Sequence, residues 1–149
     1  MRKLICAAVA TLAMASPAAA ENWHFVAEND SSLWYMDIDS ITTSGDVKSA
    51  TIVEALFDPL TDVTPNGYYV RAAMNFKCAA NSLSVDNVVI FDIDRNETSS
   101  EIGNPTPYET VVANTPASKA SDIVCGRTTA NEPVSNPYDD ADLLIESLY

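Results

Sequence analysis

The sequence predicts an α+β domain with an antiparallel sheet of about five to six strands, one short helix and a possible C-terminal helix. The first observation is the run Tyr68–Cys78, in which successive side chains alternate between an apolar and a more polar face, as in a half-buried strand. Similar runs lie on both sides of it, separated by Gly, Pro, Asn and Asp. A capped helical stretch then follows these runs.

Two strands are expected near the start of the chain. Trp23–Glu28 alternates in the same way, and the polar residues 29–32 after it have turn chemistry. Leu33–Asp37 is rich in strand-forming residues and predicts the second strand. The segment Asp37–Ile41 is expected to form a short turn or a single helical turn.

The middle of the chain predicts two further strands beside Tyr68–Cys78. Val47–Asp58 carries apolar residues on both faces, which indicates a central strand covered on two sides or a sheet that curls. Residues 59–67 contain two prolines and an Asn-Gly pair, and predict an exposed loop. Leu83–Asp94 is the most strand-like run in the chain.

After the strands, residues 95–107 are polar and predict a mobile loop, and Tyr108–Val112 could form a short final strand. Thr115 and Pro116 are typical of a helix start, with Thr115 as the N-cap. The apolar residues that follow recur at helical spacing up to Cys125, and Gly126 is a natural stop.

The C-terminal part of the chain is expected to be an extension of the domain. Residues 127–137 are polar and predict a linker or arm. Residues 139–149 could form an amphipathic helix with Leu143, Leu144 and Leu148 facing inward, or could be loose.

The first 20 residues have the pattern of a secretory signal peptide, in which Arg2 and Lys3 precede a short apolar run and three alanines. We expect cleavage near Ala20, and an exported protein that is periplasmic or secreted. The apolar run is too short to span a bilayer, which needs about 20 residues. The expected organisation is a signal peptide (1–20), one α+β domain (21–126) and a C-terminal extension (127–149).

The chain is strongly acidic, with a formal charge of −13. Loss of Arg2 and Lys3 would leave 6 basic against 21 acidic residues, a charge of −15. Nucleic acid and anionic lipid are therefore poor partners. A cationic protein, a basic host surface or divalent cations would be attracted, although the charge could serve solubility alone.

Of the three cysteines, Cys6 lies in the predicted signal peptide, which leaves Cys78 and Cys125. Two cysteines in an exported chain predict one disulfide. For a loop of this length, the chain-entropy model gives a stabilisation on the order of 4 kcal/mol.

No catalytic, metal or cofactor motif is predicted. His24 is the only histidine, and no nucleophile elbow accompanies it. The acids of Asp92–Glu97 alternate as in a calcium loop, but Glu97 stands where the sharp turn needs glycine and Gly103 where the bidentate glutamate belongs. Paired carboxylates for glycoside hydrolysis could come from Asp37, Asp39, Asp92 and Asp94, but acids at strand ends are usually solvated.

One strand face carries an unusual set of side chains for an acidic chain. On the more polar face of Tyr68–Cys78 lie Tyr69, Arg71, Asn75 and Lys77, three of which are potential hydrogen-bond donors with amide or cationic groups. We take these residues as the candidate partner-binding face.

The order of these features resembles the bacterial surface-adhesin protein E family. The resemblance covers about Trp23 to Cys125 and includes Trp34–Ile41 (WYMDIDSI), the strand that ends in Cys78 and the Thr-Pro helix that ends in Cys125. It implies a bent antiparallel sheet, a helix packed against it and one disulfide. It also implies binding to extracellular-matrix or plasma proteins and a possible dimer. The chain departs from the family because it lacks a lipid-attachment cysteine and continues beyond Cys125.

These observations favour an exported, non-enzymatic binding module for a protein partner. The alternative hypothesis is an acidic inhibitor of a cationic enzyme such as lysozyme in the periplasm, since the predicted domain is small, disulfide-bonded and strongly negative.

Overall fold

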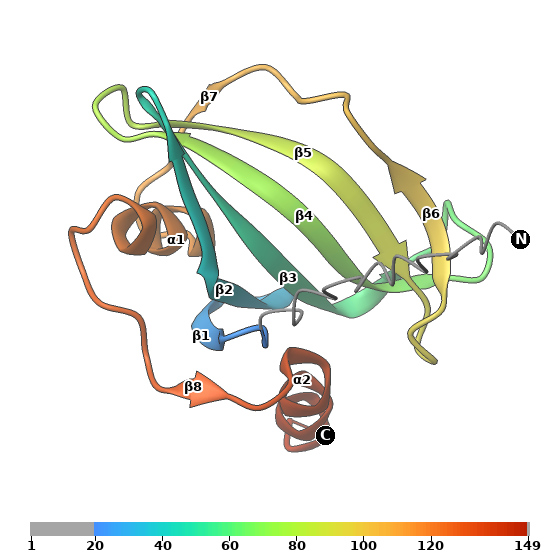
Figure 1. The fold of residues 1–149 in the computed structure, drawn as a ribbon. Coiled ribbons are helices and arrows are strands. Elements are labelled where there is room, and N and C mark those ends of the chain that lie inside the picture. Colours follow the sequence, from blue (N-terminus) through green and yellow to red (C-terminus); the bar gives the residue numbers. More distant parts are fainter. Residues whose placement is uncertain (1–19, 149) are drawn as a thin grey trace, which may run out of the picture.

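The computed structural model describes residues 20–148, so the predicted signal peptide lies outside the described residues except for Ala20. Within these residues the chain forms one antiparallel sheet of eight strands and two short helices. Figure 1 shows how they are arranged. Seven strands follow the order β6-β5-β4-β3-β2-β1-β8, and β7 pairs with β5. The α+β class is confirmed, but the sheet is larger than the predicted five to six strands.

The strands are β1 (Trp23–Glu28), β2 (Ser32–Ser44), β3 (Val47–Leu60), β4 (Gly67–Lys77), β5 (Ser82–Phe91), β6 (Glu97–Glu101), β7 (Glu109–Thr110) and β8 (Pro133–Val134). The helices are α1 (Pro116–Val124) and α2 (Pro137–Glu146).

The predicted turn at Asp37–Ile41 is wrong, because β2 continues through this segment. The β2–β3 register passes from Asp37 opposite Thr51 to Thr42 opposite Ser49, which marks a bulge. The Ser40 hydroxyl donates a 2.6 Å hydrogen bond to the Asp37 carbonyl and accepts one of 2.8 Å from the Thr51 backbone N–H. These bonds replace the missing ladder bonds, so the strand bends without ending.

The predicted loop over residues 95–107 contains β6. This strand pairs with the second half of β5, from Val88 opposite Glu101 to Phe91 opposite Glu97. Its sequence, ETSSE, has no apolar residue, and only Thr98 is even half-buried. An edge strand that buries no side chain needs no apolar alternation, so the sequence pattern could not reveal it.

Helix α1 confirms the predicted start and stop. The Ser118 backbone N–H donates to the Thr115 hydroxyl over 3.2 Å, and the Ser118 hydroxyl accepts from the Thr115 N–H over 3.1 Å, which forms a capping box. Gly126 follows the helix with φ of 72°, a left-handed conformation that glycine adopts without strain. The predicted disulfide is present and ties Cys78, just after β4, to Cys125, the C-cap of α1.

Each face of the sheet has its own apolar core. The α1 face buries residues from four strands against the helix, and its buried members are Val26, Met36, Ala50, Ile52, Met74, Phe76, Ala120 and Val124. In β3, Ile52 belongs to this core and Val53 to the opposite one, as alternation requires. The two apolar faces of Val47–Asp58 in the sequence therefore mark a central strand that is covered on both sides.

Helix α2 covers the opposite face. Its Ala141 is fully buried against Trp23, Leu33, Tyr35, Val53, Ala55 and Tyr69. The chain reaches this face by way of β8, which pairs with the edge strand β1 (Figure 1). The prediction that three leucines of this helix face inward is wrong, because Leu143, Leu144 and Leu148 are exposed. Tyr138, Ala141 and Ile145 contact the sheet instead.

Candidate binding surfaces

The four predicted partner-binding residues of β4 lie on the α2 face, and each makes contacts within the protein. Tyr69 is 2% exposed and packs edge-on against Tyr138 of α2, with ring centroids 5.1 Å apart. Its hydroxyl donates to the carboxylate of Asp142. The sequence pattern missed this burial because the covering helix lies about 70 residues further along the chain.

Arg71 is half-exposed and holds the first residues of the described chain. Its guanidinium donates to Glu21 over 2.5 Å and lies over the Trp23 ring at 5.6 Å. Although partial burial opposes ionisation of Glu21, hydrogen bonds from Trp23 and Arg71 and the charge of Arg71 lower the pKa of this carboxyl. Arg71 therefore fixes the segment that leads into β1.

Asn75 and Lys77 lie at the other end of β4. At a rise of 3.4 Å per residue, Lys77 is about 27 Å from Tyr69. Asn75 accepts a 2.5 Å hydrogen bond from the Ser49 hydroxyl, and the Lys77 ammonium lies 4.3 Å from the centre of the Tyr108 ring. The four residues thus share a strand face but do not converge on one site.

Two tyrosines of the sheet anchor α2 through its carboxylates. The Tyr35 hydroxyl donates to Asp140, and the Tyr69 hydroxyl to Asp142. Burial, together with these hydrogen bonds, raises the pKa of both phenols above the ordinary value. Arg95, from the turn between β5 and β6, bridges Asp139 over 2.5 Å and Asp142 over 3.3 Å. These contacts hold the helix on the sheet.

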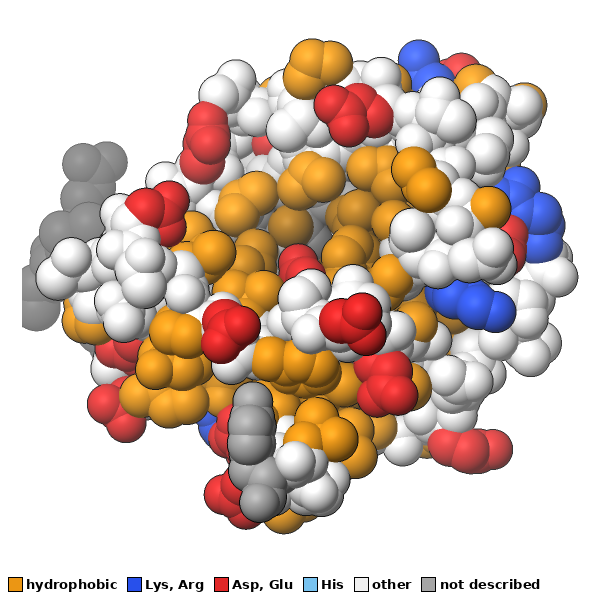
Figure 2. Space-filling model, turned by 180° about the vertical axis from the view of Figure 1, so that it is seen from behind, with side chains coloured by type: hydrophobic (Ala, Val, Ile, Leu, Met, Phe, Trp, Pro, Cys, Tyr) orange, Lys and Arg blue, Asp and Glu red, His pale blue; other side chains and the backbone are white. Residues whose placement is uncertain are grey.

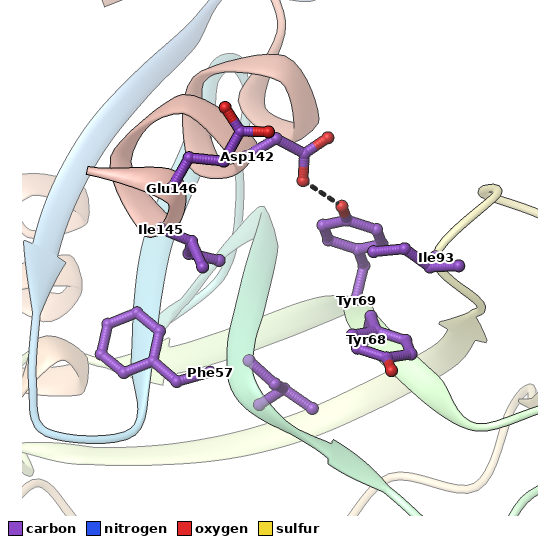
Figure 3. Close-up of a pocket in the computed structure, with 8 residues that line it drawn as sticks. Phe57, Tyr68, Tyr69, Ile93, Asp142, Ile145 and Glu146 are labelled. Carbon is purple, nitrogen blue, oxygen red and sulfur yellow. Dashed lines mark hydrogen bonds between the residues drawn. The ribbon is translucent and has the colours of Figure 1, made fainter. Parts of the chain in front are cut away.

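Beside this network lies an open cavity of about 340 Å³, shown in Figure 3. Its walls come from α2, the end of β3, the start of β4 and Ile93, and its lining residues are Leu56, Phe57, Tyr68, Tyr69, Ile93, Asp142, Ile145 and Glu146. The Tyr69–Asp142 hydrogen bond crosses one side of it (Figure 3). Because Tyr69 and Asp142 pair with each other and anchor α2, we interpret the cavity as the margin of the α2 contact.

The α1 face contains a second apolar surface, because α1 covers only one end of it. Figure 2 shows hydrophobic side chains gathered around a hollow, with acidic side chains at its margin. Strand registers define a row of residues directly opposite one another on this face, from Trp34 through Glu54 and Val70 to Ile90. All four are half-buried. We call these four residues the cross-strand row.

Glu54 is the unusual member of the cross-strand row. It lies between the apolar residues Ile52 and Leu56, while another charged residue on this side, Lys48, lies near the start of the strand, opposite Phe76. Among residues 20–148, no hydrogen bond or ion pair involves its carboxylate within the usual distances, while Arg71, Arg95 and Arg127 all pair with other acids. A charged residue that interrupts an apolar strand face was the sequence signal for this position, and the sequence interpretation missed it.

His24 and the strand-end acids take part in local structure. The His24 ring contacts the Asn131 carbonyl and, over 3.1 Å, the Asn22 side chain. Asp92 is 7% exposed and accepts a 2.8 Å hydrogen bond from the Asn96 N–H, which closes the turn into β6. Asp37 accepts a 2.9 Å hydrogen bond from the Asn22 backbone N–H.

Within residues 20–148, no group of three or more His, Cys, Asp or Glu side chains is arranged to hold a metal ion. Neither helix of this part of the chain is long and apolar enough to cross a membrane.

Comparison with known proteins identifies the fold. No protein-family model and no curated protein matches the sequence. Crystal form II of Haemophilus influenzae protein E is similar in structure, with a TM-score of 0.50 and 14% identity over 68% of this chain and 92% of that chain. The selenomethionine form of the same protein matches with a TM-score of 0.50, 15% identity, 68% of this chain and 90% of that chain. The chain is thus similar to protein E in fold.

Proposed function

We propose that this chain is an exported, non-enzymatic module that binds a protein partner. The observation that carries the proposal is the open apolar surface on the α1 face, where Trp34, Val70 and Ile90 are only half-buried around Glu54, whose carboxylate has no partner among residues 20–148. Figure 2 shows hydrophobic side chains gathered around a hollow. Apolar surface that a domain could bury but leaves open is typical of interaction sites. A wide, open apolar surface with one carboxylate fits a protein partner better than a small substrate, which is usually enclosed in a pocket.

Export is supported by the signal-peptide pattern of residues 1–20 and by the Cys78–Cys125 disulfide, since disulfides persist in oxidising compartments. We place the protein in the periplasm or outside the cell. The resemblance to the surface-adhesin protein E family adds extracellular-matrix or plasma proteins as candidate partners, and a dimer as a possible state. The acidic charge favours a cationic partner over nucleic acid.

Affinity capture tests this proposal. The purified protein is immobilised and exposed to periplasmic extract, to plasma and to matrix proteins, at low and at high salt. We expect a defined partner whose retention falls as salt rises, because part of the attraction is electrostatic. If no partner is retained under any of these conditions, the proposal fails.

The same preparation tests inhibition of a cationic enzyme, the second hypothesis. Lysozyme activity is measured with excess protein and with the protein after denaturation and reduction as control. A specific loss of lysozyme activity would identify a cationic enzyme as the partner, and unchanged activity would exclude lysozyme as the target.

A further inference from the structure

We propose that the hollow on the α1 face binds an extended segment in which a lysine or arginine lies beside apolar side chains, with Glu54 as the residue that pairs with the cation. This inference rests on the proposed function and names the chemistry of the partner. It is argued from the cross-strand row, from the state of Glu54 and from the distribution of charge.

The cross-strand row provides an apolar floor of defined length. Its residues come from four neighbouring strands, β2 to β5, so the row is about 14 Å long at 4.8 Å per strand. An extended segment of about four residues has this length. Two of the next residues on the same face, Ile52 and Ala72, are buried, which makes the floor continuous with the α1 core.

Glu54 provides the specific element of this floor. It stands directly between Trp34 and Val70, where a carboxylate loses part of its hydration. An incoming guanidinium or ammonium group would supply charge-assisted hydrogen bonds to it and place the neighbouring side chains of the segment on Trp34, Val70 and Ile90. The aromatic ring of Trp34 offers a further surface for the stem or charge of that cation.

Further acids lie on the same face, which selects against an acidic segment. Glu101 is opposite Val88, and Glu109 is opposite Leu83, whose side chain joins the α1 core. Directly opposite residues of an antiparallel pair share a face. Figure 2 shows acidic side chains at the margin of the apolar hollow. An approaching segment therefore meets a negative field at the rim and a single carboxylate inside.

A second copy of the chain fits this chemistry less well than a basic partner. Residues 21–149 contain only six basic residues. Three of these, Arg71, Arg95 and Arg127, already form ion pairs, and Lys77 lies over the Tyr108 ring. The partner is thus inferred to be a different, basic protein.

Titration with short peptides tests the inference. The first probe is Leu-Ser-Lys-Ser-Leu, in which Lys and both Leu residues share one face of the extended chain. The second has Glu in place of Lys, and the third has Ser in place of Leu. Binding is followed by amide chemical shifts and by the indole signals of Trp34 and Trp23. We expect the Lys–Leu peptide to bind, with shifts in β2 to β5 on the α1 face and at Trp34, and the other two peptides to bind at least about tenfold more weakly.

Two charge-matched variants separate Glu54 from the general charge. Glu54→Gln should weaken binding of the Lys–Leu peptide by about fivefold or more, whereas Glu146→Gln on the exposed part of α2 should change it by less than twofold. Val70→Ser should weaken binding through the apolar floor. Thermal unfolding and the amide spectrum of each free variant establish that it is folded.

Three results would overturn the inference: no peptide binds, the shifts lie on the α2 face, or the two Glu→Gln variants behave alike. The outcome is distinct from that of the proposed function. If a captured partner is retained equally by wild type and Glu54→Gln, the chain is a binding module that uses another surface. If the peptide binds through Glu54 but no protein is ever captured, the binding-module proposal fails instead.

Discussion

The Tyr35 hydroxyl donates a 2.9 Å hydrogen bond to the carboxylate of Asp140, which lies 105 residues later in the chain. Tyr69 makes the equivalent bond to Asp142, two residues further along α2. The two bonds connect a sheet formed early in the sequence to its last helix. Both hydroxyls therefore donate to carboxylates of α2 and are not free to bind an external partner.

Removal of either hydroxyl should loosen α2. Tyr35→Phe and Tyr69→Phe should each lower the free energy of unfolding by about 1–2 kcal/mol, because each bond has a charged acceptor. Tyr108→Phe, at a residue that is 40% exposed, is the matched control and should change it by less than about 0.5 kcal/mol. Denaturant titration measures all three. Equal stability of Tyr69→Phe and wild type would contradict the anchoring role.

High pH should release the same helix. Burial raises the pKa of Tyr35, Tyr69 and Tyr138 in the folded chain, so their stabilising contribution is complete below the unfolded value near 10 and is lost as pH rises through the folded values. We expect three of the six tyrosines to ionise only together with unfolding. Tyrosinate absorbance and circular dichroism, recorded on one pH series, should then show a shared late transition. Six independent titrations near pH 10 would disprove this.

Loss of the disulfide should destabilise the domain strongly. The Cys78–Cys125 bond closes a loop with a sequence separation of 47, so the paired Cys78→Ser and Cys125→Ser substitutions should cost on the order of 4 kcal/mol. Thiol labelling of the denatured but unreduced protein should find both cysteines blocked. Denaturant midpoints with and without reductant give the same comparison in the wild-type protein, and matching midpoints would rule out a stabilising bond.

A methyl group at Gly67 should be tolerated poorly. A Cβ at this position would overlap the Ile90 side chain and lie 3.3 Å from that of Val63. Gly67→Ala should therefore cost about 1–3 kcal/mol, as expected for overpacking. Ile90→Ala in the same chain should recover part of this loss, and a double-mutant cycle measures the coupling. Purely additive effects would place Ile90 away from Gly67.

The sequence was most informative where local signals and tertiary structure agree. Strand β1 and helix α1 were predicted almost to the residue, because alternation defines the strand and Thr115, Pro116 and Gly126 define the helix ends. The bulge at Asp37–Ile41 was not predictable, since its support comes from the Thr51 backbone of another strand.

The candidate surfaces were predicted only in part. The apolar side of Tyr68–Cys78 correctly marked one core face, and the disulfide that ends it was correct. The assignment of Tyr69 to an open polar face rested on local alternation, whereas α2 converts that end of the strand into a second core. The inward side of α2 was missed because the small residue Ala141 is fully buried against the sheet while Leu143, Leu144 and Leu148 are exposed.

The crossing of the chain from α1 past the β1 edge to α2 has a consequence for how the molecule responds to change. One layer of backbone separates the two cores, and each helix closes a different side of it. Substitutions on opposite sides should therefore combine additively, within about 0.5 kcal/mol, when they lie more than about 10 Å apart. The side that carries the hollow can then vary in sequence while the other side maintains the strands that shape it.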